Sequence, residues 1–329
     1  MSKNPTRKAI VITALVVVVV FVLFACMVAA FSIAKRILRP PIDITGGTSL
    51  VYEIDAQGLS EDEKKDLSQR MITVLRRRID PRGTLPILWR PLGDMRFEVQ
   101  VSRAAGSSAP QDIQRMVKGA GILEFRILPT SDDPEVTPEK VADYVELLQT
   151  KGPKDASDDE YVWCEVENND EWNVPASVRA MFGDKWYVLA SNKANEAMLY
   201  SASKREWKLE RAYPTNDQMG RRAIGFVLDD RGGKLFGNVT GNNVDRPLCI
   251  LLDGIAMSAP RIESRIYRQA VITGSFTRTE VEDIVNKLNA GCLPARLIEQ
   301  PISIKTIGPA VGPDTPDKRT GIERNLSKD

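Results

Sequence analysis

The sequence contains no histidine, and this absence excludes several kinds of chemistry at once. Without histidine there is no Ser-His-Asp or Cys-His catalytic group and no histidine-ligated metal site. The sequence also lacks a Gly-rich phosphate loop, a dinucleotide-binding fingerprint and carboxylates at metal-loop spacing. The acidic pair Asp229-Asp230 follows a predicted strand and is typical of a helix cap rather than of a catalytic dyad. We therefore expect no catalytic residues, no metal, no cofactor and no enzymatic activity.

Cysteine is scarce and unpaired along the chain. The four residues are Cys26, Cys164, Cys249 and Cys292, and no two of them form a C-x-x-C motif. Cys249 lies in the apolar stretch "PLCILLDG", which indicates a small core residue. The spacing of Cys164 and Cys292 neither supports a bridge nor rules one out. We interpret the thiols as structural, because redox activity requires a paired or electropositive setting.

The charges are balanced, with 45 Lys and Arg against 44 Asp and Glu in 329 residues. A net basic excess, which a nucleic-acid partner would favour, is absent, so we expect no nucleic acid to bind. The length is enough for about two domains in addition to any membrane anchor.

One long stretch, residues 9–34, carries no charge at all. As a helix it would be about 39 Å long, which is enough to cross a hydrocarbon core of about 30 Å. A cleaved signal peptide has a shorter apolar core, and a lipoprotein signal at Cys26 would not continue apolar beyond that cysteine. A retained anchor in membrane lipid fits best. Cations flank both ends, so the positive-inside rule leaves the orientation open.

The first part of the remaining chain predicts a compact unit. Ser60 and Glu63 form a capping box that opens a helix, and an apolar stripe follows as far as Ile79. Leu50, Tyr52 and Ile54 alternate with more polar residues and predict a strand before this helix. Predicted strands at 85–90 and 96–101, a helix at 110–118 and a strand at 121–128 complete a strand–helix–strand–strand–helix–strand order. This is the split βαβ, ferredoxin-like order. The run Arg76–Arg78 is interpreted as a solvated helix end, with a binding role as the alternative.

The second part is also of mixed helices and strands. A proline-rich boundary follows residue 128, and a helix is expected at 138–150. Four of the five tryptophans lie in 155–214, where they form either a peptide-binding face or the core of a small domain. Asp253-Gly254 predicts a tight turn between two strands, and Thr277 with Glu280 predicts a capped helix. A last strand is expected before Gly308, and the polar residues after it are typical of a disordered tail. The fold class is therefore α+β.

Several blocks, in this order, carry a resemblance to a known family. They are "IDITGGTSLVYEID", "VLRRRID", "ILEFRIL", "FVLDDRGGKLFGNVTGNNVDRPLCILLDGIAMSAPRI", "ITGSFTRTEVEDIVNKLNAGCLPARL" and "TIGPAVG". Together they resemble bacterial SecD, the protein-export subunit of the SecDF family, from about Arg7 to Gly312. Asp43, Gly46 and Gly47 match the family's Gly-Gly element beside the first membrane helix, and Asp253 and Gly254 match its head turn. Thr45 stands where the family has arginine.

The resemblance implies an architecture and an orientation. A cytoplasmic N-terminus (1–8) would precede a transmembrane helix (9–34) in the bacterial cytoplasmic membrane, with the bulk of the chain on the periplasmic side. A ferredoxin-like base (41–128 and 276–307) would carry an inserted head (129–275), and a disordered tail (308–329) would follow. The expected partners are a SecF-like subunit, the SecYEG channel and unfolded exported polypeptide.

Three functional hypotheses remain open. The first is an export accessory that binds preprotein emerging from SecYEG and aids its release; the proton-driven helices of the family are missing from this chain. The second is an anchored scaffold that docks SecF or the channel without gripping substrate. The third is an anchored hydrolase, which would require carboxylates converging in a cleft. Apolar surface on the head would favour the first, and apolar edges on the base the second.

Overall fold

The computed structural model describes residues 46–106, 109–170, 172, 174–200, 207–298 and 300–309. The predicted N-terminal segment (1–8), the predicted membrane helix (9–34) and most of the predicted tail lie outside these residues. Within them, no helix has both the length and the apolar character needed to cross a membrane.

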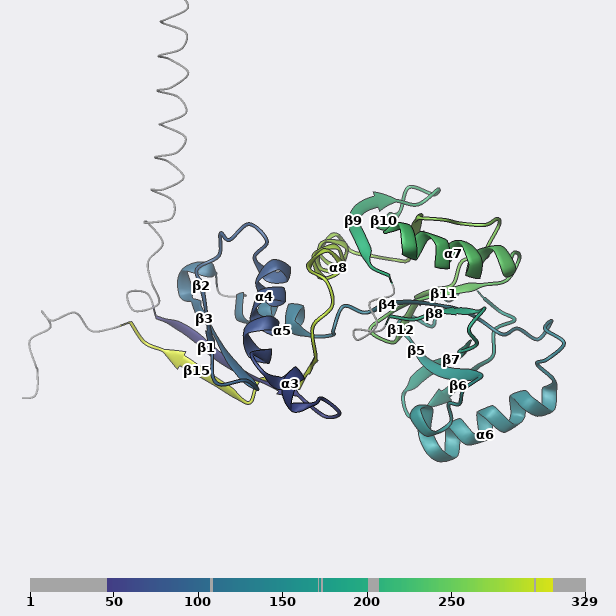
Figure 1. Cartoon of the computed structure of the whole chain (residues 1–329), viewed down its shortest axis with the longest axis horizontal. Helices are drawn as coiled ribbons and strands as arrows, with labels where there is room; N and C mark the ends of the chain where they lie inside the picture. Colours follow the sequence, from purple (N-terminus) through teal and green to yellow (C-terminus); the bar gives the residue numbers. More distant parts are fainter. Residues whose placement is uncertain are drawn as a thin grey trace, which may run out of the picture.

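The described chain forms two units that lie end to end (Figure 1). The smaller, here named the five-stranded unit, comprises residues 46–122 and 292–309. Its sheet has the order β14-β1-β3-β2, and β15 pairs with β1 on the same side as β14. Its elements are β1 (Gly47–Asp55), α3 (Glu61–Lys64), α4 (Leu67–Ile79), β2 (Ile87–Pro91), β3 (Arg96–Ser102), the short 3-10 turn η1 (Arg103–Ala105), α5 (Ala109–Val117), β14 (Arg296–Leu297) and β15 (Ser303–Ile307).

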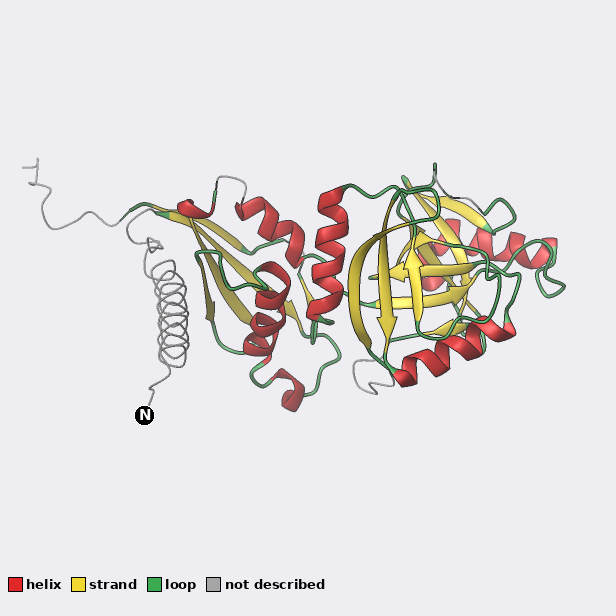
Figure 2. Ribbon diagram, turned by 90° about the horizontal axis from the view of Figure 1, so that it is seen from above, coloured by secondary structure: helices red, strands yellow, loops and turns green. Residues whose placement is uncertain are grey.

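The helices of this unit cover one face of the sheet (Figure 2). Leu50 and Tyr52 alternate along β1 toward that face, and both are fully buried. Phe97 stands opposite Tyr52 on β3, with its ring centroid 5.6 Å away. Met71 and Leu75 of α4 close the same core. The period of two along the strands and the apolar stripe of the helix thus meet as the sequence predicts.

The helix predicted from Ser60 to Ile79 is interrupted. The capping box of Ser60 and Glu63 is present, but it caps the short α3. Asp66 has a left-handed backbone (φ 52°), and α4 starts after it. The N–H of Asp66 donates to the carboxylate of Asp94, and Ser68 donates to the carbonyl of Gly93. Contacts with a loop far along the chain therefore override the local helical preference.

The larger unit, here named the two-sheet unit, comprises residues 123–291. A seven-stranded sheet has the order β6-β7-β5-β12-β11-β4-β8, and a three-stranded sheet has the order β13-β10-β9. Its elements are β4 (Leu123–Ile127), α6 (Pro138–Asp155), β5 (Tyr161–Val166), β6 (Arg179–Phe182), β7 (Lys185–Ser191), β8 (Ala197–Met198), β9 (Leu209–Asn216), β10 (Arg222–Leu228), α7 (Asp230–Asn242), β11 (Leu248–Leu252), β12 (Ile255–Ser258), β13 (Gln269–Ile272) and α8 (Arg278–Ala290).

An aromatic cluster lies at the centre of this unit. The ring centroid of Phe125 on β4 is 4.7 Å from that of Phe236 on α7 and 5.4 Å from that of Phe226 on β10. All three side chains are fully buried. Phe125 thus joins the seven-stranded sheet, the three-stranded sheet and α7 into one core.

The interpretation of the tryptophans as core residues is correct for Trp163 and Trp207, which are both buried. Trp172 and Trp186 are partly buried and pack against a neighbouring apolar cluster. Asp229 caps α7, as predicted, by accepting from the N–H of Gly232 at 2.8 Å.

The predicted split βαβ order is wrong in its last strand. β4 does not join the sheet of β1; it pairs with β11 and β8 in the seven-stranded sheet. The position beside β1 is taken by β14 and β15, so the strand expected before Gly308 is two short strands. The reason is non-local, because pairing with β11 places Phe125 against Phe226 and Phe236, which lie far along the chain.

The helix α8, expected to return to the base, contributes to both units. Val281, Val285 and Leu288 face the core of the two-sheet unit. The side-chain amide of Asn289 donates to the carbonyl of Ala212 on β9 and accepts from its N–H, at 2.9 and 2.7 Å. On its other side α8 contacts α4, so it stands between the units in both views (Figures 1 and 2).

We predict that Phe125→Ala lowers the free energy of unfolding by about 3–5 kcal/mol, because it leaves a cavity where the two sheets and α7 meet. Phe182→Ala, on the partly exposed β6, should cost less than about 1 kcal/mol. Urea denaturation followed by tryptophan fluorescence measures both. Equal losses would show that Phe125 is not central to this core.

Candidate functional site

The Gly46-Gly47 element lies where the described chain begins and ends. Gly47 opens β1 and pairs with Ile307 of β15 on one side and with Ser102 of β3 on the other. Gly46 has a left-handed backbone (φ +66°), and a Cβ on it would lie 2.5 Å from the carbonyl oxygen of Ile307. The pair therefore permits both an unusual backbone and a close approach of two chain segments. Asp43 and Thr45 lie outside the described residues.

The second sequence-predicted pair, Asp253-Gly254, is a two-residue turn between β11 and β12, as expected. Leu252 pairs with Ile255, and both turn residues have positive φ, 58° and 84°. Paired positive φ values are the requirement of a type I′ hairpin, which explains the Asp-Gly sequence. The structure does not bring this turn near Gly46-Gly47; it lies at the junction of the two units.

The chain crosses between the units twice, near residues 120–123 and 291–293, and Asp253 binds the first crossing. Its carboxylate accepts from the N–H of Gly121 at 2.6 Å and of Ile122 at 2.9 Å. Its own N–H donates to the carbonyl of Ile122 at 2.8 Å. Lys287 of α8 lies 3.4 Å from the same carboxylate. Asp253 thus connects the hairpin, the crossing and α8.

Arg78 binds the crossing from the other unit. It is fully buried, and its guanidinium donates to the carbonyls of Gly119 at 2.8 Å and of Ala120 at 3.0 Å. Burial lowers the pKa of Arg78 to about 10, opposed by the charge of Asp253 and by Cys292. The interpretation of Arg76–Arg78 as a solvated helix end is therefore wrong for Arg78, although Arg76 and Arg77 are exposed.

The helical spacing contained a signal for this burial. Arg78 follows Met71 by seven residues and Leu75 by three, so it falls on the buried stripe of α4. The predicted apolar stripe leaves this arginine out, because a charged side chain is seldom buried unless it is paired or hydrogen-bonded.

Cys292 lies on the second crossing, and its thiol donates to the carbonyl of Gly121 at 3.1 Å. Burial raises its pKa to about 11, so the thiol is protonated at neutral pH. The three described cysteines, Cys164, Cys249 and Cys292, are free, so the open question of a Cys164–Cys292 bridge is answered in the negative. Cys249 is fully buried, as expected of a core residue.

A groove of about 530 Å³, here named the junction groove, opens beside these contacts. Its walls come from α5 and β14 of the five-stranded unit and from β11, β12 and α8 of the two-sheet unit. Its apolar lining residues are Met116, Ala120, Ile122, Leu252, Ile255, Met257, Ile284 and Leu297. Its charged lining residues are Arg115, Lys118, Glu124, Glu167, Asp253, Glu280, Asp283, Lys287 and Arg296.

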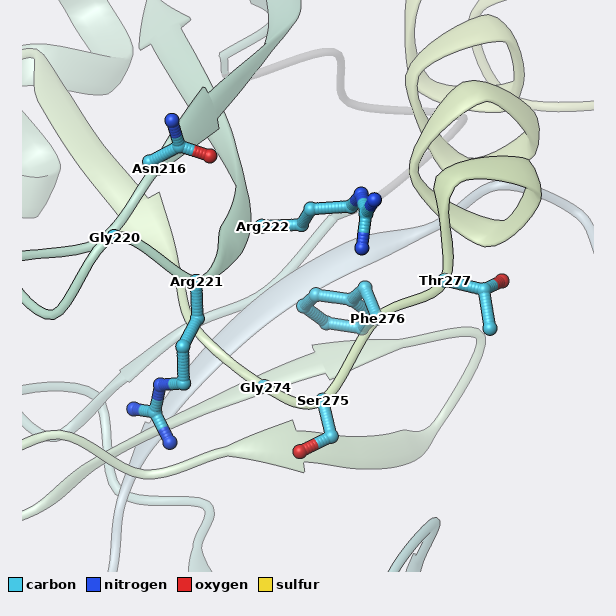
Figure 3. Close-up of a pocket in the computed structure, with 8 residues that line it drawn as sticks. All are labelled: Asn216, Gly220, Arg221, Arg222, Gly274, Ser275, Phe276 and Thr277. Atoms are coloured by element: carbon cyan, nitrogen blue, oxygen red, sulfur yellow. The ribbon is translucent and has the colours of Figure 1, made fainter.

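A second hollow, of about 540 Å³, lies between the β9–β10 turn and the segment before α8. Figure 3 shows Arg222 extending from β10 and Phe276 from that segment. The ring of Phe276 lies against Gly274, where a Cβ would approach it to 2.9 Å. Met219, at the tip of the adjacent turn, is 81% exposed. Neither hollow contains a nucleophile beside a base, and within the described residues no three carboxylates or thiols are grouped to hold a metal ion.

Comparisons with known proteins give consistent matches. A family model described as the SecDF P1 head subdomain matches residues 187–295, a range that includes α8. Protein translocase subunit SecD of Elusimicrobium minutum is 30% identical over 303 residues, which are 89% of this chain and 57% of that protein. SecD of Endomicrobium trichonymphae is 29% identical over 291 residues, 85% of this chain and 55% of that protein. The chain spans about half the length of these relatives.

Two solved structures share the fold. One is a crystal structure of SecDF in a super-membrane-facing form, with a TM-score of 0.54 at 24% identity over 82% of this chain and 32% of the other. The other is described as a membrane component SecDF that enhances protein export, with a TM-score of 0.51 at 23% identity over 78% of this chain and 99% of the other. The mixed helix and sheet architecture therefore resembles that of SecDF.

We predict that Gly46→Ala destabilises the protein by about 1–3 kcal/mol more than Gly58→Ala does. Both glycines have positive φ, so the backbone strain of an alanine is common to the two variants. Only Gly46 has neighbouring atoms where the new Cβ would lie. Thermal unfolding of the two variants measures the difference, and equal shifts would contradict a close packing of Gly46 on Ile307.

We also predict that Asp253→Ala costs about 2–4 kcal/mol and Asp253→Asn less than about 1 kcal/mol. Asparagine keeps an oxygen for the N–H groups of Gly121 and Ile122 and tolerates positive φ. Alanine leaves both donors without their acceptor. Denaturant unfolding distinguishes the two variants; equal costs would mean that the Lys287 charge pair, rather than the backbone donors, accounts for the role of Asp253.

Proposed function

We propose that this chain, which is similar to SecD over most of its length, is a non-enzymatic accessory of protein export. In this proposal it binds unfolded polypeptide as it emerges from the SecYEG channel on the trans side of the membrane and aids its release. The relatives named as translocase subunits support this role. The absence of histidine excludes Ser-His-Asp and Cys-His hydrolysis as alternatives to binding.

We propose that the five-stranded unit corresponds to the ferredoxin-like base of the family and the two-sheet unit to its inserted head. The sheet order β14-β1-β3-β2 with α4 and α5 on one face supports the first assignment. The match of residues 187–295 to the head subdomain supports the second.

Anchoring through residues 9–34 in the bacterial cytoplasmic membrane, with the two units on the periplasmic side, belongs to the same proposal. Its support is the uncharged length of that segment. Gly47 pairs with Ile307, so the first and last described strands of the five-stranded unit place the two ends of the described chain side by side. That arrangement suits a domain that is attached to the membrane at one side of the five-stranded unit.

The observation that carries polypeptide capture is the junction groove, because it combines an apolar floor with a large volume between the two units. Exposed apolar side chains of the two-sheet unit add to it, Met219 most of all. Capture of unfolded chain requires such accessible apolar surface.

The alternative is a scaffold that docks a SecF-like subunit or the channel without gripping substrate. Ile302 and Ile304 favour it, since they are 46% and 58% exposed beside and on β15. Among the described residues β15 pairs only with β1, so its outer edge is open to another strand.

We predict that the full chain, placed in nanodiscs of zwitterionic lipid, binds a secretory protein held unfolded at least about tenfold more tightly than its folded form. Fluorescence anisotropy of the labelled secretory protein measures both affinities. Empty nanodiscs are the control. Equal or absent binding of the two forms would overturn capture. If the chain then associates with SecYEG in nanodiscs, and Ile304→Asp abolishes this association, the result would favour the scaffold.

A further inference from the structure

The junction groove has three features that together would recognise one kind of ligand. The first is its floor, to which Ile122 contributes from the five-stranded unit and Ile255, Met257 and Ile284 from the two-sheet unit. None of these four side chains is fully buried, so each offers apolar surface to an occupant. A ligand with apolar side chains would therefore remove apolar surface from water by binding there.

The second feature is a strand edge. Arg296 and Leu297, which form β14, line the groove, and β14 is the last strand of its sheet. Among the described residues it pairs only with β1. Its outer side can therefore accept the backbone of an extended segment, which is how a strand edge recognises polypeptide in general.

The third feature is an uncompensated carboxylate. Glu167 follows β5, and its N–H donates to the carbonyl of Ala256, which holds it beside β12. Its carboxylate has no hydrogen bond or ion pair within the described residues. Desolvation by the groove walls and the nearby Glu280 raise its pKa. A cation placed there would supply the ion-pair partner that this carboxylate lacks among the described residues.

The groove's own cations on that side form no ion pair with Glu167, although the charge of Lys287 partly opposes the rise in its pKa. Lys287 forms an ion pair with Asp253 at 3.4 Å, and Arg115 forms one with Asp283 at 2.7 Å. Lys118 and Arg296, which have no described ion-pair partner, line the groove from the five-stranded unit. The groove is therefore polarised, with spare negative charge on the side of the two-sheet unit.

We propose that the junction groove binds an extended polypeptide segment in which apolar residues neighbour a lysine or arginine, with the cation paired to Glu167. This inference rests on the proposed function and names the site and the sequence preference of capture. The segment's apolar side chains lie on Met257 and Ile284, and its backbone adds to the edge of β14.

The test uses the full chain in zwitterionic nanodiscs and two fluorescein-labelled peptides of equal length. Both alternate valine and serine; one carries lysines at its centre and the other glutamates at the same positions. Glu167→Lys reverses the charge at the groove, and Glu146→Lys is the matched control on the exposed face of α6. Glu167→Gln and Met257→Asp complete the set, and thermal unfolding confirms that each variant folds.

We expect the lysine peptide to bind the parent and Glu146→Lys equally and Glu167→Lys about fivefold more weakly, with Glu167→Gln between them. Met257→Asp should weaken both peptides. The glutamate peptide should bind Glu167→Lys more tightly than the parent.

Lysine-peptide affinities that are the same in all variants would overturn the groove as the site. If the unfolded secretory protein still binds in that case, the proposed function stands and the site lies elsewhere. If neither peptide nor unfolded protein binds the parent, both proposals fail.

Discussion

The arrangement of the molecule depends on how the backbone between its two units is hydrogen-bonded. A chain that crosses from one core to another carries N–H and C=O groups that neither sheet can pair. Here Asp253 accepts the N–H groups of Gly121 and Ile122, and Arg78 binds the carbonyls of Gly119 and Ala120. One side chain comes from each unit, so the crossing is held from both sides by charged groups. Charge-assisted hydrogen bonds are stronger than neutral ones, which suits them to holding this segment in place.

The position of α8 follows from the same constraint. Its apolar stripe completes the core of the two-sheet unit, while Lys287 on another face reaches Asp253. The helix therefore cannot shift along either unit without disturbing a buried core or the crossing. Cys292, directly after it, adds a thiol that burial keeps protonated and bonded to Gly121. The two crossings are thus tied to each other as well as to the units.

Features of the fold with a local cause could be predicted from the sequence, and features with a non-local cause could not. The caps by Ser60, Asp229 and Thr277 and the turn at Asp253 depend on residues within a few positions, and all are present. The sheet that β4 joins depends on β11, more than a hundred residues later, and the local pattern of β4 is the same in either sheet. Burial of Arg78 required carbonyls from residues 119–120. The junction groove required both units, so no single stretch of sequence could indicate it.

The contacts that hold the crossing also decide the charge of the groove beside it. Because Lys287 pairs with Asp253, it forms no ion pair with Glu167, and its charge offsets only part of the rise in the pKa of Glu167 that desolvation and Glu280 cause. Because Thr277 and its N–H hold Glu280 in a capping box, that carboxylate is fixed in place with its pKa lowered. Glu167 is then the carboxylate whose charge is left for an occupant. Stability at the junction and negative charge in the groove are therefore two results of one set of hydrogen bonds.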